Sequence, residues 1–78
     1  MAVFLRGDKV LLILPADPSK GLEIETIECG VLKGDTGREG DLIRADTYIL
    51  QTRQASTAHG IREGQTLSGI KREQMTHL

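Results

Sequence analysis

The chain has 78 residues, of which 38% are hydrophobic and 27% are charged, and its formal net charge is −1. This composition is typical of one small globular domain and argues against intrinsic disorder, while the longest apolar run, from Val10 to Leu14, is too short to cross a membrane. Charges of both signs are interspersed, so no long-range field that would attract DNA or another polyanion is expected.

Cysteine usage and the first residues predict the compartment. Cys29 is the single cysteine and cannot form an intrachain disulfide, which favours a reducing environment. The opening residues have no cationic lead and no small-residue cleavage site, so we expect no secretory signal. The prediction is a cytoplasmic protein, or a component of a virion if the source is viral.

Two strands are predicted at the start of the chain, over residues 2–6 and 9–14, on either side of Gly7 and Asp8. Glycine adopts the positive φ that a two-residue hairpin turn requires, so we expect these strands to pair. Pro15 cannot donate a hydrogen bond to a strand ladder, and we therefore expect the second strand to end before it.

The next predicted strand covers residues 22–33 and changes its hydrophobic phase along its length. Around Ile24 the even-numbered positions are apolar, whereas from Ile27 onward the odd-numbered positions are apolar. One inserted residue produces such a change, which predicts a β-bulge near Glu25 and Thr26. With this bulge, Ile24 and Ile27 would both face apolar surroundings.

Residues 34–41, GDTGREGD, separate this strand from the next hydrophobic run. Regularly spaced glycines with charged neighbours are typical of an exposed turn, in which glycine takes a positive φ. Two more specific alternatives fit less well. A phosphate-binding loop would continue from Gly40 with Lys and Ser or Thr rather than with Asp41. A calcium loop needs carboxylates at alternating positions, which Asp35, Glu39 and Asp41 supply only in part, and it needs a terminal Glu that is missing at the right spacing.

The second half of the chain contains further short extended runs. A predicted strand over residues 42–53 is followed by a polar connection over 53–60 and by one or two short strands within 61–71. No segment has a long apolar helical period, so the predicted class is all-β: a small antiparallel meander, sandwich or partly open barrel of about four to six short strands. We expect residues 1–71 to form one domain and the charged residues 72–78 to form a C-terminal arm.

The residues that could carry chemistry are scattered along the chain. His59 and His77 are not spaced as metal ligands, and Cys29 lies within a predicted strand. We interpret the histidines as solvated side chains and the cysteine as a small buried hydrophobe. Ser56 and Ser68 have no recognisable general base nearby. The sequence therefore predicts a protein that is not an enzyme, with no catalytic, cofactor or metal site and no small-molecule substrate.

Nucleic-acid binding is an alternative, because small β-barrels often bind single strands with a positive groove and stacking aromatic side chains. The second half of the chain has a small excess of basic residues, and it also contains the tyrosine. The candidate contacts are Arg44, Tyr48, Arg53, Arg62, Lys71 and Arg72.

The apolar run near the N-terminus favours a role in assembly. Alternate residues of a strand face opposite sides, and a small chain without helices can cover one side of such a strand with its own sheet, so the other side needs another subunit. The candidate interface residues are Val10, Leu11, Leu12, Ile13 and Leu14. We expect a homo-oligomer or a structural subunit of a larger assembly, for example a decoration or cement protein of a phage particle. The alternative is a barrel-type binding module for nucleic acid or a protein target, a small inhibitor included.

Overall fold

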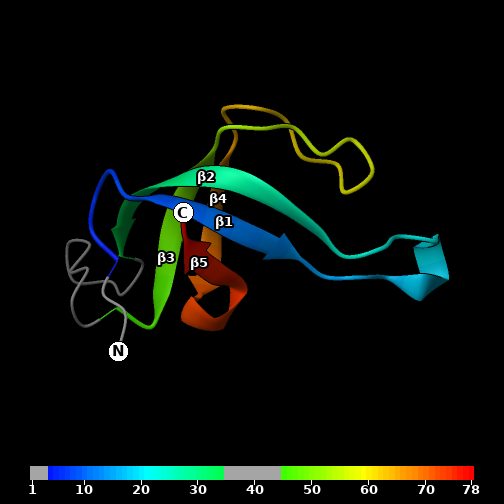
Figure 1. Cartoon of the computed structure of the whole chain (residues 1–78), viewed down its shortest axis with the longest axis horizontal. Coiled ribbons are helices and arrows are strands. Elements are labelled where there is room, and N and C mark those ends of the chain that lie inside the picture. The colour runs from blue at the N-terminus through cyan, green and yellow to red at the C-terminus, as the bar shows by residue number, and fades with distance from the viewer. Residues whose placement is uncertain (1–3, 35–44) are drawn as a thin grey trace.

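The computed structural model describes residues 4–34 and 45–78, which form one antiparallel sheet. Its strands follow the order β4-β3-β2-β1-β5 (Figure 1), so that β1 to β4 are neighbours in the order of the sequence and β5 lies beside β1. The strands are β1 (Lys9–Leu14), β2 (Glu25–Gly34), β3 (Thr47–Thr52), β4 (Thr66–Lys71) and β5 (Met75–His77). This architecture confirms the predicted all-β class and the antiparallel meander. Among the described residues, no helix has the length and apolar character that crossing a membrane requires.

The sheet is strongly curved because its two edge strands are joined by a very short connection. The 3₁₀-helix η2 (Arg72–Gln74) leads directly from β4 to β5, although these strands lie at opposite edges of the sheet. Three residues can join the two edges only if the sheet curls toward itself. Because β4 and β5 are not hydrogen-bonded to each other, the result is a partly open barrel rather than a closed one.

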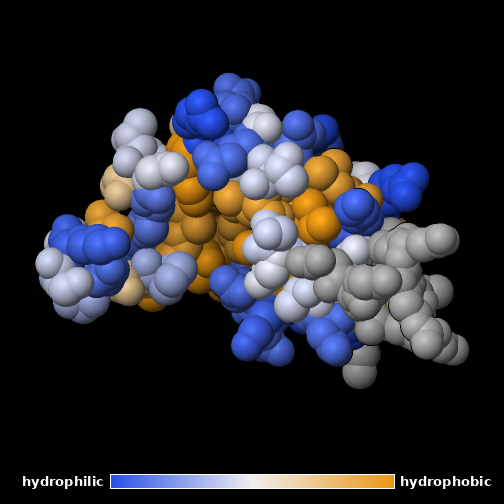
Figure 2. Space-filling model, turned by 180° about the vertical axis from the view of Figure 1, so that it is seen from behind, coloured by the Kyte–Doolittle hydropathy of each residue, from blue (hydrophilic) through white to orange (hydrophobic). Residues whose placement is uncertain are grey.

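The core lies on the inner face of this curved sheet. Alternate residues of β1, β2 and β3 point to it, as the two-residue period of a strand requires. The buried apolar residues are Phe4, Val10, Leu12, Leu14, Ile27, Cys29, Val31, Ala45, Tyr48, Leu50 and Met75. In Figure 2, hydrophobic residues gather in the middle of the face opposite to that of Figure 1, with hydrophilic residues around them.

The predicted bulge near Glu25 and Thr26 is wrong. The pairing of β1 with β2 has no register shift from Lys9↔Gly30 to Leu14↔Glu25, and Glu25 is the first residue of β2. Ile24 precedes the strand and is 68% exposed, whereas Ile27 is 2% exposed. The apolar residues before Glu25 belong to a loop, so the change of phase marks the point where the strand begins.

A register shift does occur farther along β2. Between Val31 and Lys33 the pairing with β3 shifts, and Leu32 lies partly exposed at this point. A second shift lies between Tyr48 and Leu50, where β3 pairs with β4. Such irregularities bend the strands and increase their twist, which agrees with the curvature of the sheet.

The N-terminal segment forms the predicted turn but not the predicted hairpin. The Asp8 N–H donates to the Leu5 carbonyl at 3.0 Å, the Leu5 N–H donates to Asp8 Oδ2 at 2.9 Å, and Gly7 has a φ of 87°. We expect a strand at residues 2–6, but the described part of it, residues 4–6, does not pair with another strand in a ladder. Instead, the Gly7 N–H bonds the Val31 carbonyl at 2.8 Å and fixes the turn beside β2.

The C-terminal residues complete the sheet and do not form the predicted arm. β5 pairs with β1 from Val10↔His77 to Leu12↔Met75, and the Met75 side chain is buried in the core. The sequence of this segment is polar except for Met75 and Leu78, which is why an apolar strand pattern was not visible there. The turn predicted at residues 34–41 lies outside the described residues, apart from Gly34 at the end of β2.

Candidate functional site

Two loops project from the same end of the sheet, because successive turns of an antiparallel meander alternate between its ends (Figure 1). The β1–β2 loop covers residues 15–24, and the β3–β4 loop covers residues 53–65. Each contains an isolated antiparallel bridge, and the bridges are Asp17↔Leu22 and Ser56↔Ile61.

The two bridges close six-residue turns with the same hydrogen bonds. The Leu22 N–H and the Asp17 carbonyl are joined at 3.0 Å, and the reverse bond is also 3.0 Å. The corresponding pair of bonds between Ser56 and Ile61 measures 2.9 Å in both directions. In each turn the fifth residue is a glycine with a φ of 70°. Both loops therefore have tips that are closed by their own backbone hydrogen bonds.

The fourth residue of each turn is a lysine or a histidine, and its side chain contacts the side chain of the first residue of the turn. Lys20 Nζ lies 3.9 Å from Asp17 Oδ2, and His59 Nδ1 lies 3.2 Å from Ser56 Oγ. These two side chains differ in exposure, because Lys20 extends into solvent while the His59 side chain is only 10% exposed. The interpretation of His59 as a solvated residue is therefore wrong.

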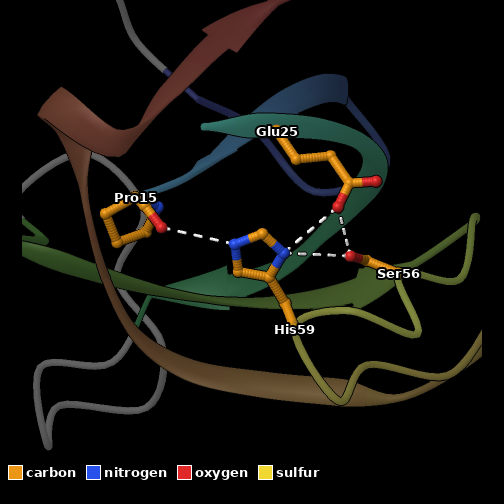
Figure 3. Close-up of polar contacts among 4 residues, drawn as sticks. All are labelled: Pro15, Glu25, Ser56 and His59. Carbon is orange, nitrogen blue, oxygen red and sulfur yellow. Dashed lines mark hydrogen bonds and ion pairs between the residues drawn. The ribbon is translucent and has the colours of Figure 1, made fainter. Parts of the chain in front are cut away.

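His59 joins the two loops through a polar cluster (Figure 3). Its Nδ1 lies 3.1 Å from Glu25 Oε2, and its Nε2 lies 3.3 Å from the Pro15 carbonyl. The Ser56 hydroxyl also donates to Glu25 Oε2. Pro15 follows β1 and Glu25 begins β2, so the cluster ties the base of the β1–β2 loop to the tip of the β3–β4 loop.

A serine, a histidine and a carboxylate together raise the question of nucleophilic catalysis. In a catalytic triad the serine and the acid bind opposite nitrogens of the imidazole, so that a proton can pass through the ring. Here Ser56 and Glu25 both face Nδ1, and the backbone carbonyl of Pro15 faces Nε2. Ser56 is also 3% exposed. The geometry is that of a clasp between loops and provides no relay from the serine.

Beside this clasp, two adjoining hollows separate the β1–β2 loop from the β3–β4 loop; together they are called the inter-loop groove. The first hollow, of about 530 Å³, is lined by residues that include Pro15, Ala16, Asp17, Leu22, Ala58 and His59. The second, of about 400 Å³, is lined by residues that include Leu22, Glu23, Ile24, Glu25, Ala58 and His59. Both volumes lie within the range of about 300–1,000 Å³ that is common for ligand sites.

His77 is held in a second contact that links distant parts of the sequence. Its ring stacks on Phe4, with centroids 4.4 Å apart and an angle of 16° between the planes, and its Nε2 lies 3.2 Å from Asp8 Oδ2. The pKa of Asp8 is lowered, mainly because the Leu5 N–H donates to its carboxylate, with a further contribution from His77. The sequence could not reveal this contact, because its members lie at opposite ends of the chain.

Tyr48 cannot serve as the predicted stacking platform for nucleic acid. Its side chain is 0% exposed, and its ring packs edge-to-face against Phe4 at a centroid distance of 5.5 Å. Tyrosine at an inward position of a central strand fills the core because no tryptophan and only one phenylalanine are present to do so.

The predicted basic contacts do not form one surface. Arg53 follows the end of β3 and Arg62 lies in the β3–β4 loop, whereas Lys71 and Arg72 lie at the other end of β4, beside the beginning of β3. Arg44 lies outside the described residues. The described part of the chain therefore lacks the continuous positive groove on which the nucleic-acid alternative depended.

The structure divides the candidate interface residues between two faces of β1. The side chains of Val10, Leu12 and Leu14 are buried in the core, whereas Leu11 is half-buried and Ile13 is 36% exposed on the outer face. Cys29 is buried as expected. Among the described residues, no three histidine, cysteine or acidic side chains are grouped as they would be to hold a metal ion.

No family model, no curated protein and no solved structure matches this chain.

Proposed function

We propose that this protein is a non-enzymatic assembly subunit that associates through the outer face of β1. The observation that carries the proposal is the pair of aliphatic side chains, Leu11 and Ile13, that the chain's own core leaves uncovered. The core is filled by the other face of the same strand, so these two residues are not needed to complete it.

A third aliphatic residue extends this surface. The Leu78 N–H bonds the Lys9 carbonyl at 3.1 Å, and the Leu78 side chain is exposed. Because His77 faces the core side with Val10, strand alternation places the next side chain on the outer side, with Leu11 and Ile13. We call Leu11, Ile13 and Leu78 the β1 outer patch.

The neighbours of the patch suit a contact between protein surfaces. On the adjacent strands, Thr26 lies opposite Ile13, and Glu28 and Thr76 lie opposite Leu11. An aliphatic centre with polar or charged neighbours is common in protein interfaces, where the core of the patch is apolar and the rim is polar. Self-association of this kind is consistent with a decoration or cement subunit of a phage particle, a context proposed by analogy.

The oligomeric state tests the proposal. Sedimentation velocity of the wild type from nanomolar to micromolar concentration should show reversible self-association, and the double variant Leu11→Lys/Ile13→Lys should sediment as a folded monomer. The control Gln51→Lys/Thr66→Lys adds the same charge at exposed positions of β3 and β4 and should associate as the wild type does. A wild type that is monomeric throughout would overturn self-association through this patch.

A further inference from the structure

The two hollows of the inter-loop groove differ in chemistry. The first has apolar groups of Pro15, Ala16, Leu22 and Ala58 beside the paired charges of Asp17 and Lys20. The second has the carboxylates of Glu23 and Glu25 beside aliphatic side chains. Leu22, Ala58 and His59 line both hollows, so the groove is continuous. A ligand that fills it must therefore present an apolar group and a polar group side by side.

The charge of the second hollow is negative. Glu23 is exposed and makes no ion pair among the described residues. Glu25 uses only Oε2 for the clasp, and in Figure 3 its second oxygen points away from Ser56 and His59. The lining of the second hollow contains no lysine or arginine, and Lys20 lies in the first hollow beside Asp17. The histidine of this lining, His59, already contacts Oε2 of Glu25. A ligand group that matches the charge of this hollow is therefore a cation.

The aliphatic residues around these carboxylates specify the kind of cation. Ile24 is largely exposed in the same hollow as Leu22 and Ala58. A metal ion gains nothing from such neighbours, whereas the side chains of lysine and arginine have an apolar stem and a charged head. The stem would cover Ile24 and the head would reach the carboxylates.

The walls of the groove are already ordered. The closed turns at Asp17↔Leu22 and Ser56↔Ile61, together with the His59 contacts to Glu25 and Pro15, fix the two loops relative to each other. A preformed groove loses little conformational entropy on binding, so most of the ordering cost falls on the occupant.

We propose that the inter-loop groove binds an extended segment of a protein partner in which a lysine or arginine lies two residues from an apolar side chain. Alternate side chains of an extended chain face the same side, so these two residues would enter the two hollows together. The cationic head pairs with Glu23 and Glu25, and the apolar side chain packs on Pro15, Leu22 and Ala58. The site is separate from the β1 outer patch, and either can exist without the other.

The test uses the full chain and the synthetic peptide acetyl-Leu-Ser-Lys-Ser-Leu-amide, titrated to about 1 mM while ¹H–¹⁵N chemical shifts are recorded. Saturable shifts are expected at residues of the two loops, including Leu22, Ala58 and Gly60. A peptide with glutamate in place of the lysine should not bind. Glu23→Gln should weaken binding about two- to fivefold, as for loss of one exposed ion pair, and Glu63→Gln, outside the groove, should not.

A matched pair of substitutions locates the site. Ala58→Lys places a cation in both hollows and should weaken binding by about tenfold or more, whereas Thr57→Lys adds the same charge at the neighbouring exposed residue and should have less than about a twofold effect. Equal binding of the glutamate peptide, shifts confined to the β1 outer patch, or no saturable shift at all would overturn the proposal. So would shifts at the groove that depend only on protein concentration, because the occupant would then be a second copy.

Discussion

Cys29 illustrates how position on a strand determines the chemistry of a side chain. It points inward from β2 between Ile27 and Val31, and burial raises the pKa of its thiol to about 11. The Arg53 N–H opposes this shift and the charge of Glu28 adds to it, but burial is the largest cause. The thiol is therefore both protonated and inaccessible under ordinary conditions, in agreement with its interpretation as a small hydrophobe.

We predict that Cys29 does not react with an aromatic disulfide reagent at about pH 8 while the protein is folded. Unfolding in urea exposes the thiol and returns its pKa toward the ordinary value, so the reaction should then be fast. The absorbance of the released thiolate, followed with and without urea, gives both rates. As a control, Ser68→Cys introduces an exposed thiol on β4 that should react in both states. Equal reactivity of Cys29 in both states would contradict its burial.

At the scale of the element, β2 shows where the sequence was informative. From Ile27 to Val31 the alternation of apolar and polar residues was correct, because one face of this strand is covered by the core and the other is not. The same alternation at Leu22 and Ile24 was misleading. Those residues belong to a loop held by its own hydrogen bonds, and their apolar side chains line the inter-loop groove.

Two alanine substitutions separate the observed register from a bulge. Ile27→Ala should lower the free energy of unfolding by about 2–5 kcal/mol, because it leaves a cavity in the core. Ile24→Ala removes a side chain that is largely exposed and should cost less than about 0.5 kcal/mol. Urea denaturation of the two variants provides both values. A cost for Ile24→Ala as large as that for Ile27→Ala would indicate that Ile24 is also in the core.

At the scale of the whole molecule, sequence periodicity predicted the class and most of the strands but not the pairing of the C-terminal strand β5 with β1. Met75–His77 is too short and too polar to stand out as a strand, and it is ordered by β1, which only the tertiary structure brings beside it. The clasp was missed for the same reason. Glu25 and His59 are far apart in sequence, and no local spacing relates a residue at the beginning of β2 to one in the β3–β4 loop.

Met75 should therefore contribute to stability as a core residue does. Met75→Ala is expected to lower the free energy of unfolding by about 2–5 kcal/mol, whereas Thr76→Ala, at the next and exposed position of β5, should cost less than about 1 kcal/mol. Thermal and urea unfolding, followed by circular dichroism, would measure both changes. If neither variant is destabilised, residues 72–78 behave as an arm and β5 is not part of the stable sheet.

The pairing of β1 with β5 also constrains the order in which the chain can fold. The other ladders join strands that follow one another in sequence, but this one joins β1 to β5, which are the first and last strands of the described residues. During synthesis, β1 can pair with β2 early, while its other edge stays unpaired until Met75–His77 has left the ribosome. Contacts between such distant residues are entropically costly to form, and folds dominated by them fold slowly. Until that last step an unpaired edge of β1 is available to other chains, so the native sheet is most vulnerable to wrong pairing while it is being made.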